Sequence, residues 1–394
     1  MNVLVLNGGS SSIKFSIFSV AGDDGPTLLL DGELSGIGET EATLAITQGE
    51  RTHAGRAGTD ADTTAGAIGV VLDAVGKATA GAVEAVGYRV VHPGAEIEDH
   101  VRITGEVLRA LEAAAEFAPL HDPEAVAMIR EAMRRMPEVP HVACFDTVFH
   151  RTMPEEASTY AIPKEYRERG VKRYGFHGLS CESIVRQMRD AGPVPERMVI
   201  AHLGSGCSVT AVVNGASVDT TMGLTPTGGV VMGTRPGDLD PGLMLYLLRQ
   251  QGGGDAAVAI ETMLNHRAGM VSLTGLPNDM RAVRRAAAGG DAQAVLALKV
   301  FARCVRKAIG GFAWLMGGLD ALVFTGGIGA HDAATRADVL HGCGVAIDSS
   351  LNEAAGEGLR RISASDSKTA VFAAPAQEDL VIALHVKRMV EADA

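Results

Sequence analysis

Apolar and polar positions near the start of the chain follow the pattern of β-strands. Residues 3–6 are apolar throughout, which is typical of a buried strand, and small residues at 8–12 then form a turn. Apolar and polar residues alternate over 13–17, so we expect a second strand there. Residues 28–34 supply a third strand, whereas the polar stretch 39–62, rich in Gly and Thr, predicts no definite element.

The rest of the first half alternates between helical and strand patterns. We expect a helix over 63–79, a strand over 85–91 and a further strand over 142–146, which ends in the carboxylate of Asp146. Another helix begins at Asp122, because Asp is a favoured N-cap and the proline after it suits the first helical turn. This order of elements is typical of an α/β domain.

The second half begins with the same pattern as the first. A strand, a Gly/Ser turn and a second strand occupy residues 198–213. When the chain is shifted by 196 residues, Gly8 falls on Gly204 and Ser12 falls on Ser208. The repeat of strand, turn and strand at the head of each half predicts a duplicated α/β domain.

The last third of the chain adds another glycine turn and a long apolar helix. The turn at 325–329 follows the apolar run 319–324. The helix over 294–316 is apolar nearly all round, so we expect it to be buried. The remaining predicted elements are a strand, a helix, a strand and a final helix, at 216–220, 332–340, 369–373 and 378–390.

Composition restricts the function without changing this fold. The chain has 394 residues, enough for about two domains. Aromatic residues make up 4% and the formal net charge is -12, so we expect no nucleic-acid partner. The five cysteines are scattered, which fits a reducing compartment. The first residues lack the pattern of a signal peptide, and no apolar run of about 18 residues occurs, so we expect a cytoplasmic protein with no membrane partner.

The turn after the first strand has a composition suited to phosphate. Glycine N–H groups can approach phosphate oxygens, the hydroxyls of Ser10 and Ser12 add donors, and Lys14 adds a positive charge. An ordinary hairpin with a solvated lysine explains the same residues, and the spacing is not that of a P-loop. Three glycine turns after apolar strands, spread over both halves, favour one nucleotide held in a cleft between two domains.

Two arginines and a histidine are candidates for binding an anionic substrate. Arg89 lies at the end of an apolar strand, where its charge needs an internal acid or an anionic ligand. Arg235 lies in a turn-rich stretch with two acids, where it either binds a carboxylate or phosphoryl group or forms a surface salt bridge. His177 lies among glycines that give its ring room to meet a substrate, although a lone histidine more often has a structural role.

Two acids are candidates for a metal site. Asp146 and Glu378 carry the hard oxygen ligands that suit Mg²⁺, either directly or through waters. The alternatives for both residues are helix capping and structural salt bridges.

The chain resembles the acetate kinases in four segments, 6–15, 174–178, 202–204 and 232–241. The similarity runs over nearly the whole chain, and the Met-Gly-Thr-Arg stretch is close to diagnostic. It implies the fold shared by acetate and sugar kinases, actin and heat-shock chaperones, which is α/β with two duplicated actin-like (ribonuclease H-like) domains and a central interdomain cleft. We accordingly place the first domain at 1–147 plus 379–394, and the second, which carries the adenosine site, at 148–378.

The resemblance also implies a reaction and its partners. The γ-phosphoryl group of ATP passes reversibly to acetate by direct in-line transfer, giving acetyl phosphate and ADP, with Mg²⁺ as cofactor and a homodimer as the usual assembly. A carboxylate is already ionised at pH 7 and needs no general base. Positioning and charge neutralisation therefore carry the catalysis.

Residue roles follow from the same resemblance. The residues matching the catalytic set are Arg89, Asp146, His177 and Arg235. The two arginines hold the substrate and the transferring phosphoryl group, the histidine stabilises the transition state, and Asp146 orients the metal and the carboxylate. The metal ligands are Asn7 and Glu378. The acyl pocket is lined by Val91, Leu120, Phe176 and Pro226. The nucleotide and phosphate site consists of Asn7, Ser10, Ser12, Lys14, His202, Gly204, Ser205, Gly206, Asp279, Met280, Arg281, Gly327, Ile328 and Gly329.

Four departures from the family pattern keep alternatives open. They are Ser205 in place of Asn, Leu179-Ser180-Cys181 in place of Thr-Ser-His, the stretch 225–229 in place of a bulkier acidic one, and Ala330-His331 in place of Glu-Asn. The last change touches nucleotide recognition, so pyrophosphate is an alternative donor. Val91 narrows the acyl pocket and favours acetate, but one methylene is worth only ~1–3 kcal/mol, so propionate and butyrate are alternative substrates. A non-catalytic ATP-binding switch is the least favoured alternative.

Overall fold

The computed structural model describes residues 1–9, 11–20, 25–39, 41–57, 59–78, 82–114, 122–251 and 255–392. The chain divides into two compact units. Unit 1 consists of Met1–Val148 and Gln377–Ala394, and unit 2 consists of Phe149–Ala376. The expected boundaries differ from these by one and two residues, because the final helix begins at Glu378 and packs on strands β1, β2, β6 and β8 of unit 1.

Unit 1 contains an eight-stranded sheet in the order β5-β4-β3-β2-β1-β6-β8-β7. Its strands are β1 (Asn2–Gly8), β2 (Ser12–Ser19), β3 (Thr27–Ser35), β4 (Thr43–Gln48), β5 (Arg51–Arg56), β6 (Ala85–Val90), β7 (Val101–Arg102) and β8 (His141–Phe145). The strands β1 to β3 are antiparallel, whereas β1, β6 and β8 run parallel. The polar stretch without a sequence assignment supplies β4, β5 and a short 3-10 helix, Thr59–Asp62.

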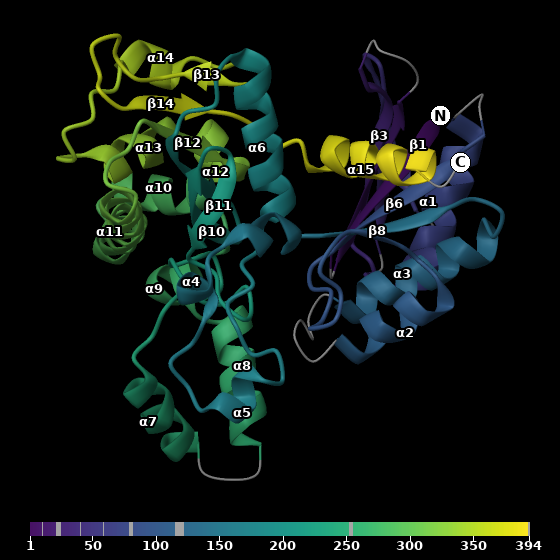
Figure 1. The fold of residues 1–394 in the computed structure, drawn as a ribbon, viewed down its shortest axis with the longest axis horizontal. Coiled ribbons are helices and arrows are strands. Elements are labelled where there is room, and N and C mark those ends of the chain that lie inside the picture. The colour runs from purple at the N-terminus through teal and green to yellow at the C-terminus, as the bar shows by residue number, and fades with distance from the viewer. Residues whose placement is uncertain are drawn as a thin grey trace. The chain divides into compact units, whose positions relative to one another are not determined.

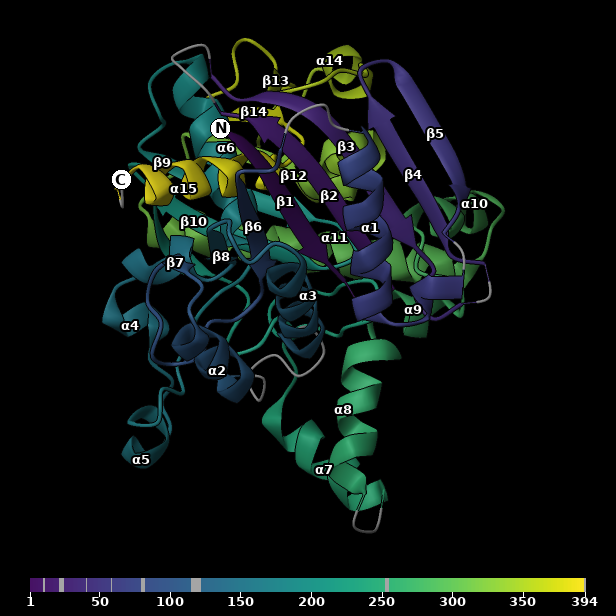
Figure 2. The ribbon, with the colours of Figure 1, turned by 90° about the vertical axis from the view of Figure 1, so that its right-hand side faces the viewer.

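Helices cover both faces of this sheet. They are α1 (Thr64–Ala78), α2 (Gly105–Ala113), α3 (Asp122–Arg135) and α15 (Glu378–Ala392). Helices α1 and α3 pack together over the face turned to the viewer in Figure 2, and α15 crosses the opposite face (Figure 1). A Cβ at Gly87 of β6 would lie 2.5 Å from Ile382 Cγ2 and 2.7 Å from Val386 Cγ2. Glycine at this position therefore lets α15 lie close against the sheet.

Unit 2 repeats the central topology of unit 1. Its strands are β9 (Arg197–Leu203), β10 (Cys207–Val213), β11 (Ala216–Thr220), β12 (Ala321–Thr325), β13 (Arg360–Arg361) and β14 (Ala370–Ala373), in the order β11-β10-β9-β12-β14-β13. The five strands β11-β10-β9-β12-β14 match β3-β2-β1-β6-β8 in order and direction. This repeat confirms the predicted duplicated α/β fold.

The strand register corrects one detail of the predicted repeat. Gly8 pairs with Ile13 across the first turn, whereas in the second hairpin the N–H of Gly204 already bonds to the carbonyl of Gly206, at 3.0 Å. The first turn is therefore longer. Ser208 pairs with His202 of β9, whereas Ser12 at the start of β2 has no partner in β1. The counterpart of Ser208 in the first hairpin therefore lies farther along β2 than Ser12. An ungapped shift of the sequence cannot detect a change in turn length.

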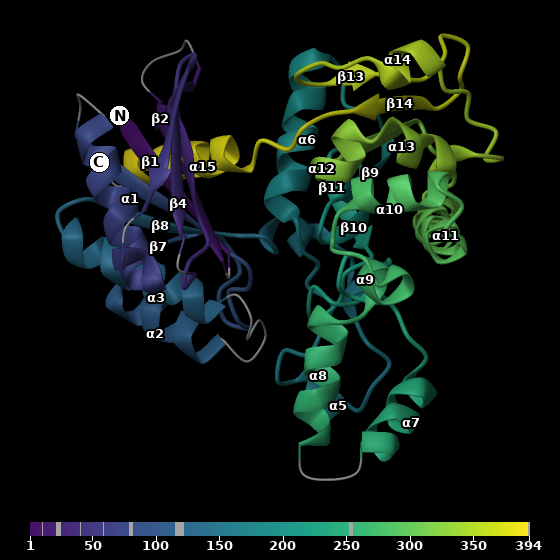
Figure 3. The ribbon, with the colours of Figure 1, turned by 180° about the vertical axis from the view of Figure 1, so that it is seen from behind.

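Two helices sandwich the sheet of unit 2. Helix α6 (Gly178–Ala191) packs on one face, and α11 (Ala292–Leu315) packs on the other, as Figures 1 and 3 show. The other helices are α4 (Glu155–Ser158), α5 (Lys164–Arg167), α7 (Pro241–Gln251), α8 (Ala256–His266), α9 (Gly269–Thr274), α10 (Met280–Ala288), α12 (Gly326–His331), α13 (Ala333–Leu340) and α14 (Ser349–Glu353). No described helix is long and apolar enough to cross a membrane.

The prediction that the long apolar helix is buried all round is wrong. Phe301, Val305 and Ile309 of α11 are buried at a helical spacing and form its inner face. In contrast, Leu296 is 56% exposed and Trp314 is 90% exposed. The apolar pattern reports a preference for leaving water, but it does not tell whether the covering surface lies within the same chain.

Candidate active site

A buried ion pair lies at the end of the parallel strands of unit 1. Arg89 of β6 donates through Nε to both carboxylate oxygens of Asp146 at 3.1 Å, and through Nη2 to Asp146 Oδ2 at 2.5 Å. Asp146 directly follows β8, the neighbouring parallel strand, and is 1% exposed. The carboxyl ends of parallel strands meet at one edge of a sheet, so the topology itself brings these two residues together. The fork-like contact fixes the plane of the guanidinium.

Two further elements reach the same arginine. Asn7, near the end of β1, accepts a hydrogen bond from Arg89 Nη1 at 3.3 Å, and Glu378, the first residue of α15, places Oε2 3.7 Å from Arg89 Nε. Asp379 accepts a hydrogen bond from the Ser16 hydroxyl at 2.6 Å and another from the Asn7 side chain. Sequence reasoning missed Asp379. Its position beside Glu378 at the start of the last predicted helix was the available signal.

This cluster has more acidic than basic side chains. Burial opposes the charge of Arg89, yet Asp146 and Glu378 raise the pKa of its guanidinium above the ordinary value. Burial raises the pKa of Glu378 to about 7, with Arg89 opposing this shift and Asp146 adding to it. Burial likewise raises the pKa of Asp379. The cluster contains three carboxylates, whereas its positive charges are one guanidinium and the more distant Lys14. The carboxylate oxygens form a donor set that fits a divalent cation.

The other residues predicted for unit 1 lie around this cluster or outside the described chain. Lys14 pairs with Asn7 across the β1–β2 hairpin and is exposed, and Ser12 begins β2. Val91 is half-buried directly after β6. Ser10 and Leu120 fall outside the residues that the structure describes.

His177 of unit 2 has an unusual backbone and a fixed ring. It precedes α6 with a φ of 57°, a left-handed conformation that costs a non-glycine residue free energy. Its Nδ1 lies 2.9 Å from Ser208 Oγ, and its ring stacks on His202 with centroids 4.0 Å apart and planes at 24°. A Cβ at Gly206 would lie 3.3 Å from His177 Nε2. The glycine turn therefore passes directly beside the histidine.

The histidines and glycine turns of unit 2 form one group. His202, at the end of β9, is held by Ser180 Oγ at 2.7 Å from its Nδ1. A Cβ on Gly204 would lie 3.7 Å from His202 Nε2 and 3.9 Å from the N–H nitrogen of Gly327. The two glycine turns predicted to grip phosphate and adenosine are thus adjacent in space. The roles of Ser208 and Ser180 were not predicted, because neither serine has a distinctive sequence context.

The loop that carries Arg235 is tied to the Gly204–Gly206 turn. The N–H of Met232 bonds to the carbonyl of Arg235 at 3.0 Å, and the N–H of Gly233 bonds to the carbonyl of Ser205 at 3.0 Å. Arg235 Nη1 donates to the carbonyl of Pro226 at 3.2 Å, and burial lowers the pKa of this guanidinium. The structure therefore brings Arg235, Pro226 and the Gly204–Gly206 turn together.

Phe176 is part of the packed interior beside this loop. It is 1% exposed, and its carbonyl lies 2.9 Å from Nε2 of the buried His150. Burial lowers the pKa of His150 to about 4, so this imidazole is neutral and serves as a fixed hydrogen-bonding group.

The predicted adenosine residues occupy the starts of two helices. Asp279 caps α10 by accepting from the N–H of Arg281 at 2.9 Å, and the Arg281 side chain is 85% exposed. Gly327, Ile328 and Gly329 lie in α12, and a Cβ on Gly327 would meet no atom within 4 Å. Asn278, which sequence reasoning missed, donates to Ser205 Oγ at 2.8 Å and links the Asp279 segment to the phosphate turn.

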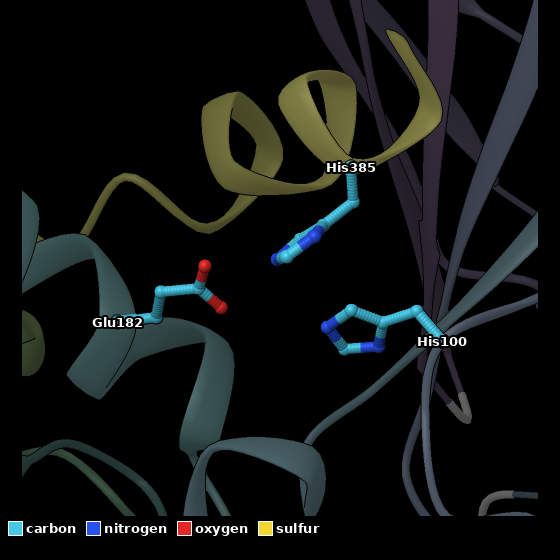
Figure 4. Close-up of side chains that lie close together, drawn as sticks. All are labelled: His100, Glu182 and His385. Carbon is cyan, nitrogen blue, oxygen red and sulfur yellow. The ribbon is translucent and has the colours of Figure 1, made fainter. Parts of the chain in front are cut away.

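A second pair of histidines, in unit 1, has a structural role. The rings of His100 and His385 meet edge to face, with centroids 4.1 Å apart. Figure 4 shows His100 approaching from the residue before β7 and His385 from α15. His100 Nδ1 accepts a hydrogen bond from the N–H of Phe145 at 3.1 Å. The pair joins α15 to the loop beside β8 and so helps to hold the helix that carries Glu378.

Comparison with known proteins found similar sequences and similar structures over nearly the whole chain. The model of the acetokinase family matches residues 2–384. An acetate kinase from Pseudarthrobacter chlorophenolicus is 42% identical over 392 residues, covering 97% of each chain, and one from Anoxybacillus flavithermus is 39% identical over 399 residues, covering 98% of each. Among solved structures, a Porphyromonas gingivalis acetate kinase aligns with a TM-score of 0.87 at 32% identity, covering 99% of each chain. A Francisella tularensis propionate kinase aligns with a TM-score of 0.89 at 34% identity, covering 98% of this chain and 99% of its own.

Proposed function

The chain belongs to the acetokinase family, and from this premise we propose that it transfers the γ-phosphoryl group of ATP reversibly to acetate. The observation that carries the proposal is the Arg89 cluster, in which one immobilised guanidinium is surrounded by Asp146, Asn7 and Glu378. Such a group binds a planar carboxylate or phosphoryl oxygens bidentately. It has no evident use in a protein that only changes shape with ATP.

We assign the metal role to Asn7 and Glu378. Both present oxygen atoms next to Arg89, and the surplus of carboxylates there favours a divalent cation. Mg²⁺, when bound, would neutralise phosphate charge during the transfer. Asp146 is occupied by Arg89, so its role is to hold the guanidinium in position and not to remove a proton.

We assign charge stabilisation in the transition state to His177 and Arg235. When the Ser208 hydroxyl donates to His177 Nδ1, the imidazole proton resides on Nε2, the nitrogen beside the Gly206 turn. That N–H can then donate to an equatorial oxygen of the transferring group. The half-buried Arg235 loses hydration that an anionic oxygen would replace. The nucleotide phosphates would lie on the Gly204–Gly206 turn, with adenosine near Asp279 and Gly327.

The acyl substrate is the least determined part of the proposal. Val91, Phe176 and Pro226, which the family resemblance assigns to the acyl pocket, are apolar residues that suit a methyl group. One extra methylene changes binding by only ~1–3 kcal/mol, so propionate is the alternative substrate. The similarity to a propionate kinase is as high as that to acetate kinases of known structure.

A hydroxamate assay for acyl phosphate tests the function directly. Purified protein is incubated with Mg·ATP and acetate, propionate or butyrate, and kcat/KM is compared across the acids. We expect acetate to be the best substrate. A higher kcat/KM with propionate would identify propionate as the preferred substrate. No product from any acid would refute carboxylate kinase activity with ATP. Calorimetry with ATP and with pyrophosphate then identifies the donor.

We further propose a homodimer in the cytoplasm. Helix α7 exposes a run of large apolar side chains, with Leu245 57% and Tyr246 54% exposed, on a helical pair that projects from the sheet of unit 2 (Figure 3). Such a patch is typical of a surface covered by a second subunit. The five free cysteines suit a reducing compartment. Light scattering on wild type and on Leu245→Glu tests the assembly, and a monomeric wild type would refute it.

A further inference from the structure

Unit 2 contains a cavity that none of the proposed reaction residues lines. It has a volume of about 530 Å³ and lies among α10, α11 and α13, which are neighbours in Figure 3. This volume lies within the range of ~300–1,000 Å³ found for small-molecule sites. The lining residues, taken together, are Arg284, Val295, Leu298, Lys299, Ala302, Arg303, Arg306, Asp338 and His341.

The charged lining is strongly biased toward cations. Four side chains carry a positive charge, whereas Asp338 is the one carboxylate. Asp338 is already engaged, because Arg284 Nη1 donates to its Oδ2 at 2.7 Å. This concentration of positive charge occurs in a chain whose formal net charge is -12. A concave surface lined by one sign of charge raises the local concentration of ions of the opposite sign.

Arg284 and Arg306 are fixed by contacts within the protein, whereas Lys299 and Arg303 are available for a ligand. Arg306 donates to the carbonyls of Val339 at 2.9 Å and Asp338 at 2.6 Å, at the end of α13. Lys299 and Arg303 lie one helical turn apart on α11, and in the described part of the chain neither forms an ion pair. Like charges at this spacing repel each other on an isolated helix. An anion between them would remove that repulsion.

The rest of the lining limits the kind of anion. Val295, Leu298 and Ala302 form an apolar wall on the same helix as Lys299 and Arg303. A free inorganic ion would leave this wall in contact with water. A short hydrocarbon skeleton that carries charged groups would cover the wall and reach both cations.

We propose that this cavity binds a small organic anion with at least two negative charges, either a polycarboxylate or an organic phosphate. Arg303 would bind one charged group through its planar fork, and Lys299 would act as a point charge for the other. The site is separate from the residues assigned to catalysis, so the proposal does not depend on the proposed reaction.

Titration calorimetry tests the site with the 394-residue chain saturated by Mg·ADP and acetate. Tricarballylate serves as the carboxylate probe and 2-phosphoglycerate, which carries a phosphate and a carboxylate, as the phosphate probe, each at low and at high salt. We expect one binding event per chain that weakens with salt. Lys299→Gln and Arg303→Gln should each weaken it about tenfold or more, as expected for the loss of a hydrogen bond to a charged group.

Lys307→Gln provides the matched control. Lys307 is an exposed cation on the same helix that does not line the cavity, so its substitution removes the same charge from α11. We expect its affinity to stay within twofold of wild type, and all three variants should keep the melting temperature and the basal turnover of wild type. Binding of only one probe would identify the charged group. No binding of either probe, or equal weakening in the Lys307 variant, would overturn the proposal.

Discussion

The pKa of Glu378 predicts how the metal-free protein responds to pH. Burial raises this pKa from 4.5 in the unfolded chain to about 7 in the folded one. Between these two values the folded state binds the extra proton and the unfolded state does not, so stability falls as pH rises through this window. The stabilising contribution is complete below pH 4.5 and is lost by about pH 7.

The size of the effect follows from the shift. Each pKa unit corresponds to ~1.4 kcal/mol, so Glu378 alone should lower the free energy of unfolding by about 3 kcal/mol between pH 4.5 and pH 8. The side chain is 17% exposed, so solvent screening removes little of this amount. Asp379, whose pKa is also raised by burial, acts in the same direction. The variant Glu378→Gln separates the two, because it removes only the titration of Glu378.

Urea denaturation of both proteins in EDTA, at half-unit steps from pH 5 to pH 8, measures this term. Wild type should lose stability relative to Glu378→Gln by ~2.5 kcal/mol as pH rises from 5 to 8. Mg²⁺ should reverse the loss at pH 8 in wild type only, since the ionised carboxylate is the form that binds the metal. Parallel pH profiles for the two proteins would show that Glu378 does not titrate in this window and would refute the reasoning.

Three further predictions test other contacts. Arg235→Ala should lower kcat/KM for acyl phosphate formation by ~10²-fold or more with an unchanged melting temperature, and a smaller loss would remove this residue from the catalytic set. Ser208→Ala should lower kcat more than it raises KM, because it releases the His177 ring without removing the ring, and normal turnover would contradict the positioning role. Gly87→Ala should cost ~1–3 kcal/mol of stability in denaturant titrations, because its Cβ would lie 2.5 Å from Ile382, and an unchanged midpoint would show that α15 can move away freely.

The sequence predicted the elements that depend on local pattern. The strands with alternating or continuous apolar runs were placed within one or two residues, and the fold class and family are confirmed. The polar stretch 39–62 was not assigned, because the edge strand β5 has exposed side chains and its neighbour β4 has none that is fully buried. Both strands therefore carry little apolar signal. The burial of α11 was overestimated for a related reason, because an apolar helix face in the sequence does not show whether residues of the same chain cover it.

Side-chain partners at the candidate site were only partly predictable. Arg89 was recognised as a charge that needs a partner, and its pairing with Asp146 follows once β6 and β8 are known to be parallel neighbours. Ser208 and Asn278 gave no signal, because their function depends on which residue lies opposite in space. Such contacts come from strand register and loop packing, which one sequence does not encode in any short motif.

The two units share one topology, but they differ in the residues at the ends of equivalent strands. In unit 1 the strands β1, β6 and β8 end near Asn7, Arg89 and Asp146, a charged set. In unit 2 the corresponding β9, β12 and β14 end in or beside neutral groups, with His202 on β9 and a glycine turn after β12. A charged cluster suits a carboxylate and a metal ion, whereas glycine N–H groups suit phosphate oxygens. Under the proposed function, the strand ends of unit 1 would hold the carboxylate and the metal ion, and the equivalent strand ends of unit 2 would hold the nucleotide phosphates.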